Sequence, residues 1–466
     1  MTPPEDVSAI LSGLLRFGIR PGLERVEAAL SALDHPERSP RTFQIVGTNG
    51  KGSTAHLVDS ILRQSGYRTG RFTSPHLSDI RERIAISGEI LSPGVFSDLV
   101  REVAALNTSL HLGLTFFEFL TVMAHRAFRR AGVDCVVLEA GMGGRWDATT
   151  VSDPIVTVLT GVSLDHEEIL GPGLLRILEE KVAVGRRGRP FVAVLADPEL
   201  RSAFLDRGRR SGFLPILSGR DFEATWEGGD PARESGPSPD GKRLLRYQGR
   251  WGTRHFAPAL TATYQSGNIA AAAAALEWSP LPISVSCFRE GIARASHPGR
   301  FETVSHNPLV LLDGAHNPEA MERLLHALFD RVGSRMSVGW LFAVHADKDW
   351  KRMLDLVREA PVSSGAFFLP DASLGEAPAG GRWASARDME GQVRGMWGEL
   401  DPCIERGGRE DLLEKALDWS RASPDRVLVV TGSLYLLGAI RPRFIPPSGP
   451  VLFSGNERDR PLSEDA

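Results

Sequence analysis

A glycine-rich loop carries the residues whose types and spacing point most directly to phosphate chemistry. The stretch IVGTNGKGSTAHL contains Gly47, Gly50, Lys51, Gly52 and Ser53. Its spacing departs from the usual pattern G-x-x-x-x-G-K-[ST], because a glycine follows the lysine. A strand before the loop and a helix after it would aim free backbone N–H groups and the positive helix end at one point. This arrangement predicts nucleotide binding; a glycine-rich turn with a solvated lysine is the alternative.

Two later strand ends carry charged residues that could serve a nucleotide or a cation. Glu139 ends the apolar run VVLE, and the segment GMGGRWD after it offers Arg145 and Asp147. Asp165 and His166 follow the next apolar run, and a histidine beside a carboxylate can ligate a cation. Taken alone, a strand-end glutamate is more often a helix cap or an ion-pair partner, and an Asp-His pair is more often a turn.

A further lysine and a cluster in the last third of the chain complete the candidate set. Lys181, in LEEKVAVG, would by itself be a surface salt-bridge lysine. Arg300, in HPGRFE, suits phosphate, and Asp313 and His316 follow a strand in LLDGAHNP. The alternative for this cluster is a turn with a helix cap at Asn317.

The elements that must position these residues follow an alternating pattern. β-rich apolar runs such as TFQIVGTNG, VDCVVLEAG and IVTVLTGVS alternate with helical patterns, the first of them from Ser53 to Ser65. Such runs, bounded by glycine, are typical of βαβ units on a buried parallel sheet. We therefore expect an α/β fold whose strand ends carry the charged residues at one edge.

The domain organisation is predicted from length and from changes in composition. With 466 residues the chain exceeds the size of one hydrophobic core. We place a boundary near residue 296, which gives domains 1–296 and 297–446 and a tail at 447–466. The polar segment 228–249 is interpreted as a surface hairpin or mobile loop.

Composition excludes several classes of function. The 54 basic and 58 acidic residues nearly cancel, so no global field favours nucleic acid or an anionic membrane. The three cysteines form no C-x-x-C pair, and we find neither a signal peptide nor a membrane span. We expect a cytoplasmic monomer that acts on small molecules, with no nucleic acid or membrane partner.

Taken together, the motifs closely resemble folylpolyglutamate synthase and the bifunctional dihydrofolate synthase/folylpolyglutamate synthase, within the muramyl-peptide-type ATP-dependent ligases. The resembling words occur in family order from residue 47 to 438: GTNGKGS, TSPHL, RERI, FFEFLT, EAGMGGRWDAT, LDHEEILG, HPGRFE, DGAHNP, ADKDW and VTGSLYLLG. Their number and order make chance resemblance a poor explanation.

The resemblance implies an N-terminal phosphate-loop ATPase domain and a smaller C-terminal α/β domain, with the active site in the cleft between them. It also implies ATP-dependent ligation of L-glutamate to dihydropteroate or a folate through an acyl phosphate. The residues that would bind ATP by motif position are Gly50, Lys51, Gly52, Ser53, Asn268, Arg300 and Asp313. Lys51, Lys181, Asp313 and His316 would act in catalysis.

The metal site is likewise implied by the resemblance. Mg2+ would be held by Ser74, Glu139 and His166. Lys181 matches the lysine that the family carries as a carbamate, whose oxygens suit a hard cation. The resemblance thus turns an ordinary lysine into a predicted ligand.

The pterin end of the substrate would lie near two segments. The implied substrate residues are Phe116, Phe117, Glu118, Arg145 and Asp147. Trp146 and Thr150 depart from the family pattern, whereas PGLERV at 21–26 resembles a dihydropteroate-contacting segment of the bifunctional members.

Two other functions remain as alternatives. One is a muramyl-peptide ligase, which uses the same ATPase chemistry, although an obvious N-terminal UDP-binding domain is absent. The other is a nucleotide-binding module without ligase activity, which would leave Glu139, His166 and Lys181 unexplained. The sequence leaves open whether dihydropteroate, a folate or both are accepted, and how long a glutamate chain is made.

Overall fold

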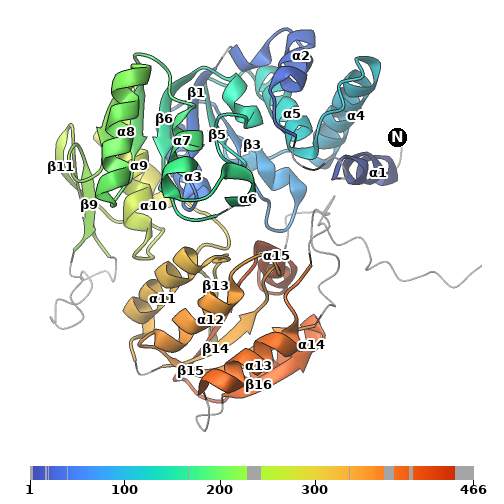
Figure 1. Ribbon diagram of the computed structural model, residues 1–466, viewed down its shortest axis with the longest axis vertical. Helices are drawn as coiled ribbons and strands as arrows, with labels where there is room; N and C mark the ends of the chain where they lie inside the picture. The colour runs from blue at the N-terminus through green and yellow to red at the C-terminus, as the bar shows by residue number, and fades with distance from the viewer. Residues whose placement is uncertain are drawn as a thin grey trace, which may run out of the picture. The chain divides into compact units, whose positions relative to one another are not determined.

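A computed structural model describes residues 4–15, 18, 20–38, 40–165, 167–227, 243–334, 336–371, 382–397 and 402–446. The chain divides into two units (Figure 1): Met1–Pro75 with Arg81–His297, and His76–Ile80 with the residues from Pro298 onward. This division differs from the expected domains in two places, since His297 lies with the first unit and His76–Ile80 with the second. The expected tail, 447–466, lies outside the described residues.

Eight strands form the central sheet of the first unit: β1 (Arg41–Val46), β2 (Thr69–Phe72), β3 (Ile84–Ile86), β4 (Glu89–Ile90), β5 (Cys135–Glu139), β6 (Pro154–Leu159), β7 (Pro190–Ala193) and β8 (Leu214–Leu217). Their order is β4-β3-β2-β5-β1-β6-β7-β8. The six strands from β2 to β8 in that order pair in parallel, and β3 and β4 are antiparallel to their neighbours. The expected α/β fold with a parallel-type central sheet is confirmed.

The helices of this part of the chain are α1 (Pro4–Leu15), α2 (Glu24–Ala32), α3 (Lys51–Gln64), α4 (Pro93–Ser109), α5 (Phe116–Ala131), α6 (Glu167–Leu170), α7 (Leu174–Val182), α8 (Pro198–Ser211), α9 (Gln265–Glu277) and α10 (Val285–Arg294), with short 3-10 turns η1 (Pro36–Arg38), η2 (Ile80–Arg83) and η3 (Ala148–Val151). Side chains alternate between the two faces of a strand, and in β1 the side chains of both faces are buried. Phe43 and Ile45 pack in one core with α3, α9 and α10, whereas Val46 packs in another with α7 and α8. The apolar strands of the sequence therefore lie between two helical layers.

A second, three-stranded sheet of the first unit consists of β9 (Glu223–Trp226), β10 (Leu245–Gly249) and β11 (Gly252–Phe256), paired antiparallel. The sequence predicts a surface hairpin or mobile loop at 228–249. Residues 228–242 lie outside the described residues, but the end of the segment forms β10, with Leu245 and Tyr247 buried. The Tyr247 hydroxyl donates to Glu277 on α9 at 2.8 Å, which fixes this sheet to the first unit.

The second unit contains a six-stranded sheet: β12 (Glu302–His306), β13 (Leu309–Leu312), β14 (Ser337–Phe342), β15 (Ser363–Pro370), β16 (Cys403–Gly407) and β17 (Arg426–Thr431). The order is β12-β13-β17-β14-β15-β16, in parallel except for β12. Its helices are α11 (Pro318–Val332), α12 (Trp350–Glu359), α13 (Ala386–Trp397), α14 (Arg409–Arg421), α15 (Leu434–Ile440) and the turn η6 (Arg441–Arg443). The first three pack in one apolar core, and α14 and α15 pack in the other.

One segment from the first half of the chain belongs to this second unit. Leu77 is buried in the core that contains Leu436, Leu437 and Leu312. The Ser78 hydroxyl donates to the Gly438 carbonyl at 3.4 Å.

Among the described residues, no helix is long and apolar enough to cross a membrane.

Candidate active site

The glycine-rich loop lies where the sheet of the first unit reverses its order. β1 pairs with β5 on one side and β6 on the other, and ligands of open α/β sheets bind at such a position beyond the carboxyl ends of the strands. Gly47 and Gly50 have φ of 149° and 90°, which favour glycine. A Cβ on Gly50 would also collide with the Asn268 side-chain oxygen, so the structure brings these two predicted nucleotide residues together.

Two lysines converge on the loop. Lys51 Nζ donates to the carbonyls of Gly47 and Thr48 at 3.1 and 3.0 Å. Lys181 Nζ, buried on α7, donates to the same Gly47 carbonyl at 2.9 Å. Burial and the neighbouring Lys51 charge lower the pKa of Lys181 to about 7. Lys181 is therefore not the solvated surface lysine that its sequence context alone suggested.

Glu139 is a buried carboxylate at this edge of the sheet. It ends β5, is only 4% exposed, and its Oε2 accepts from the Ser74 backbone N–H at 3.0 Å. The same oxygen lies 3.4 Å from the position that a Cβ on Gly52 would take. Ser74, Glu139 and the loop therefore lie together.

The remaining predicted metal residue, His166, lies outside the described residues. Within the described ranges, no group of three or more His, Cys, Asp or Glu side chains gathers in a metal-binding arrangement. A single carboxylate beside hydroxyl and phosphate-binding groups nevertheless fits Mg2+, which keeps several waters and takes few protein carboxylates. The Thr54 hydroxyl, buried without a hydrogen-bond partner in the described structure, is a further oxygen in this helix turn.

Two side chains at the loop were missed by sequence reasoning. The Ser53 hydroxyl is 3.0 Å from His297 Nδ1 and accepts from Gln265 Nε2 at 3.3 Å. Asn268 in turn donates to Gln265 Oε1 at 2.8 Å. His297 was part of the quoted HPGRFE motif, but no periodicity or spacing signal links residue 297 to residue 53.

The predicted substrate residues on α5 lie at its first turn. Phe117 packs against Phe72 with ring centroids 5.5 Å apart, and the Arg83 guanidinium lies 5.5 Å from the Phe116 ring. Glu118 accepts from the Thr115 N–H at 2.7 Å and completes a capping box.

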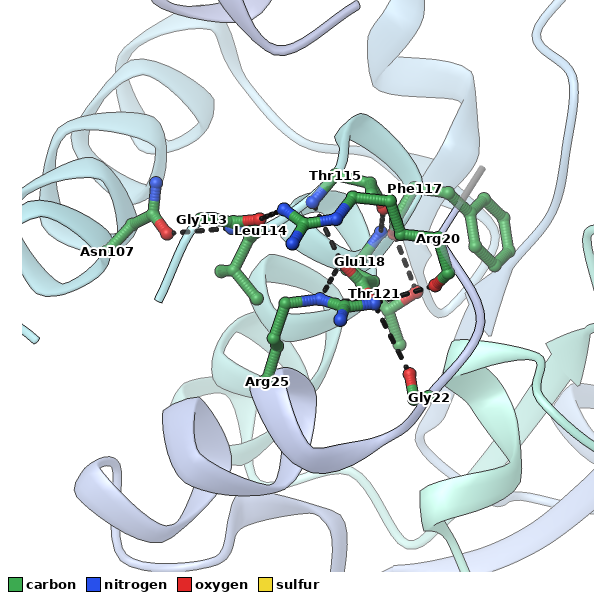
Figure 2. A network of polar contacts seen from close by, with 10 residues as sticks. All are labelled: Arg20, Gly22, Arg25, Asn107, Gly113, Leu114, Thr115, Phe117, Glu118 and Thr121. Atoms are coloured by element: carbon green, nitrogen blue, oxygen red, sulfur yellow. Dashed lines mark hydrogen bonds and ion pairs between the residues drawn. The ribbon is translucent and has the colours of Figure 1, made fainter. Parts of the chain in front are cut away.

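Glu118 also holds a segment near the N-terminus. Figure 2 shows Arg25 of α2 and Glu118 of α5 pointing toward one another; their shortest N–O distance is 2.6 Å. Arg25 also donates to the Arg20 carbonyl at 2.6 Å, and its pKa is raised chiefly by the hydrogen bond to Glu118. Glu118 therefore has a structural role at the helix start.

Arg145 and Asp147 shape the loop after β5. Arg145 pairs with Glu180 at 3.1 Å. Asp147 accepts from the backbone N–H groups of Met142 and Thr149, both at 3.0 Å, and burial raises the pKa of its carboxyl group. Trp146 between them is 55% exposed. The observed contacts of Asp147 organise the loop backbone.

In the second unit, Asp313 and His316 follow β13 as expected. Asp313 accepts from the backbone N–H groups of Phe301 and Ala315, both at 2.9 Å. A Cβ on Gly314 would collide with the Arg300 guanidinium, and His316 Nδ1 lies 2.8 Å from the Gly314 carbonyl. The structure thus brings Arg300, Asp313 and His316 together at one strand end, and Asn317 caps α11 as the alternative interpretation expected.

Comparison with known proteins identifies both units. The Mur ligase middle domain matches residues 45–276, and the Mur ligase, glutamate ligase domain matches residues 299–434. The dihydrofolate synthase/folylpolyglutamate synthase of Bacillus subtilis (strain 168) is 32% identical over 456 residues, which cover 95% of this chain and 99% of that relative.

Two solved structures extend the comparison. E. coli FolC in complex with DHPP and ADP has a TM-score of 0.80 at 28% identity, covering 94% of this chain and 97% of that chain. The bifunctional folylpolyglutamate synthase/dihydrofolate synthase of Yersinia pestis, complexed with AMPPNP and Mn ion, has a TM-score of 0.76 at 29% identity, with 94% and 97% covered. These matches support the folate-type ligase over both alternatives, a muramyl-peptide ligase and a non-ligase nucleotide-binding module. The chain belongs to the dihydrofolate synthase/folylpolyglutamate synthase family, and is an ATP-dependent ligase built from Mur ligase domains.

Proposed function

We propose that this ligase joins L-glutamate to the carboxylate of dihydropteroate, of a folate, or of both. A carboxylate is a poor electrophile, so the γ-phosphoryl group of ATP is first transferred to it. The amine of L-glutamate then attacks the acyl phosphate, and phosphate leaves. The observation that carries this proposal is the convergence of Lys51, Lys181 and Glu139 on the glycine loop at the switch point of the sheet.

The loop is the proposed ATP site. Backbone N–H groups at the start of α3, those of Gly50, Lys51, Gly52 and Ser53, would bind phosphate oxygens. Lys51, whose amine lies across the loop, would neutralise charge on the transferred phosphoryl group. Asn268 would contribute from α9, since it lies against Gly50.

Mg2+ is proposed beside this loop, with Ser74, Glu139 and His166 as protein ligands. The metal would polarise the phosphate oxygens. We further propose that Lys181 carries a carbamate, because its buried amine lies near Lys51, where a second positive charge is unfavourable and an anionic oxygen ligand is favourable.

The carbamate has a direct test. Protein equilibrated with 13C-bicarbonate should show one carbamate carbon resonance, which Lys181→Ala removes and Lys415→Ala, a change on the exposed face of α14, leaves in place. An identical spectrum for the wild type and Lys181→Ala would refute the modification.

The second unit is proposed to act on nucleotide and glutamate. Arg300 would bind phosphate or a carboxylate through its planar fork of donors. His316 is the proposed group that removes a proton from the glutamate ammonium, since the amine must be neutral to attack. Asp313 would hold the backbone that presents Arg300, because its carboxylate accepts from Phe301.

The pterin is proposed to lie near Phe116 and Phe117, with Arg145, Glu118 and Asp147 shaping its surroundings. The DHPP complex of the E. coli relative supports a pteroyl substrate for this chain. We also propose a monomer in the reducing cytoplasm, in agreement with three widely spaced cysteines, Cys135, Cys287 and Cys403, that form no C-x-x-C pair. Light scattering of the purified protein tests the oligomeric state.

The substrate assignment is tested by a product assay. Purified protein receives ATP, Mg2+ and L-glutamate with either dihydropteroate or tetrahydrofolate, and products are analysed by mass. Addition of one glutamate residue to either acceptor is expected, with none in Glu139→Ala or without ATP. Absence of ligated product with both acceptors would overturn the proposal.

A further inference from the structure

The extra glycine of the loop has a steric environment of its own. Gly52 is the second residue of α3 and, unlike Gly47 and Gly50, is not among the glycines with positive φ. A Cβ at Gly52 would lie 2.7 Å from His297 Cε1 and 3.1 Å from His297 Nε2, closer than such atoms pack. The imidazole of His297 therefore covers Gly52, and only a residue without a side chain fits beneath it.

The same imidazole contacts the next residue of the loop. His297 Nδ1 lies 3.0 Å from the Ser53 hydroxyl, which is buried. Gln265 donates to this hydroxyl at 3.3 Å, which leaves the hydroxyl hydrogen available for His297 Nδ1. The two contacts together define the orientation of the Ser53 side chain.

The imidazole is itself held in place. His56, one turn further along α3, stacks on His297 with ring centroids 4.2 Å apart and an angle of 22° between the planes. His56 Nδ1 lies 2.9 Å from the Gly52 carbonyl. The His297 ring therefore contacts three residues of α3: the His56 ring, Gly52 and the Ser53 hydroxyl.

We propose that His297 is a positioning residue of the nucleotide loop, which sits over Gly52 and orients the Ser53 hydroxyl toward the phosphates of ATP. The inference rests on the proposed ATP site. His297 acts through Ser53, so its loss should weaken nucleotide binding specifically. A role confined to folding would instead lower the active fraction and leave the KM for ATP unchanged.

Substitution of His297 gives the first test. His297→Ala should raise the KM for ATP and the Kd for ADP by about fivefold, the usual effect of one hydrogen bond, with the KM for L-glutamate within about twofold. His297→Asn, whose amide can reach the position of Nδ1, should recover most of this loss, whereas His297→Gln, which matches Nε2, should not. Equal KM for ATP in the wild type and His297→Ala would overturn the proposal.

Substitution of Gly52 gives the second test, as a double-mutant cycle. Gly52→Ala alone should raise the Kd for ADP by about tenfold or more, because the new methyl group collides with the ring. In the His297→Ala background the same change should add less than about twofold, since the obstructing ring is gone. Independent, additive effects would overturn the proposal.

Gly94 supplies the matched control. It is the second residue of α4, as Gly52 is of α3, and a Cβ there has nothing within 4 Å. Gly94→Ala should leave ADP affinity unchanged.

Calorimetric ADP binding separates the two proposals. A wild type that binds ADP but makes no ligated product contradicts the proposed function alone. Equal ADP affinity of the wild type and His297→Ala contradicts the role of His297.

Discussion

The environment of Lys181 in the structure differs from the exposed one that its sequence neighbours suggest. Its neighbours in the sequence are two glutamates, but its amine is buried and donates to the Gly47 carbonyl. A buried ammonium is costly, and it is tolerated where the side chain serves binding or catalysis. The residue is therefore expected to matter more for turnover than for stability.

At the residue scale, this gives the first prediction. Lys181→Ala should lower kcat by at least about 100-fold while changing the free energy of unfolding by less than about 1 kcal/mol, because relief of the buried charge offsets the lost packing. Steady-state kinetics and urea unfolding measure the two quantities. Lys415→Ala, at an exposed lysine, is the control, and a Lys181→Ala protein with wild-type turnover would contradict the prediction.

At the element scale, the start of α5 depends on one carboxylate that serves two partners (Figure 2). Glu118 accepts from Thr115 at the helix cap and from Arg25 of α2. Arg25→Ala should therefore lower the free energy of unfolding by about 2 kcal/mol, because it leaves a largely buried carboxylate without its cation.

Urea unfolding checks this value. Arg421→Ala, which breaks the exposed pair with Asp418, should change stability by less than about 0.5 kcal/mol. Equal losses of unfolding free energy in Arg25→Ala and Arg421→Ala would contradict the larger contribution predicted for the pair of Arg25 and Glu118.

A buried histidine on the same helix predicts a pH dependence of stability. Burial lowers the pKa of His125 to about 4 from 6.5. Below pH 6.5 the imidazole is protonated in the unfolded chain, whereas in the native state it stays neutral down to about pH 4. The free energy of unfolding therefore keeps its full value above pH 6.5 and decreases as the pH falls from 6.5 to about 4. The loss at pH 4 from this group is about 3 kcal/mol.

Urea unfolding of His125→Leu from pH 7 to pH 4 should show a correspondingly flatter profile than the wild type. His326→Leu, at an exposed histidine of α11, should retain the wild-type slope. A wild-type slope in His125→Leu as well would assign the acid sensitivity to other groups.

At the scale of the whole molecule, the two units are linked by three chain passages: Pro75 to His76, Ile80 to Arg81, and His297 to Pro298. The short segment between the first two supplies Leu77 to a core of the second unit. Leu77 atoms lie 3.3 and 3.4 Å from the position of a Cβ on Gly299. The second unit is therefore incomplete without residues from the first half of the chain.

Leu77→Ala should destabilise the second unit by about 2–3 kcal/mol, the cost of a buried leucine truncation. Hydrogen exchange should show lower protection in α15 and β13, with β1 unchanged. Leu110→Ala, which is 46% exposed in wild type, is the control. Lower protection of β1 alone would contradict the assignment of this segment to the second unit.

The sequence by itself determined the fold class and the family, because both are recorded in local patterns: apolar runs of strand length, glycines at strand ends and ordered motifs. It also named the loop, Glu139 and Lys181. For the segment 228–249 the sequence left a surface hairpin and a mobile loop as alternatives, and its end, Leu245–Gly249, forms a strand antiparallel to both β9 and β11. Local propensity is a weak guide where cross-strand packing decides.

Only the tertiary structure decided which distant residues share an environment. His297 over Gly52, Lys181 at Gly47 and Leu77 in the second core join positions separated by more than 100 residues. No spacing rule reaches that far, since side-chain periodicity describes one element at a time. Gly52 is the clearest case. The sequence shows that a glycine follows the lysine, unlike in the usual loop pattern. The structure shows why this position has no side chain: the His297 imidazole occupies the space that one would need.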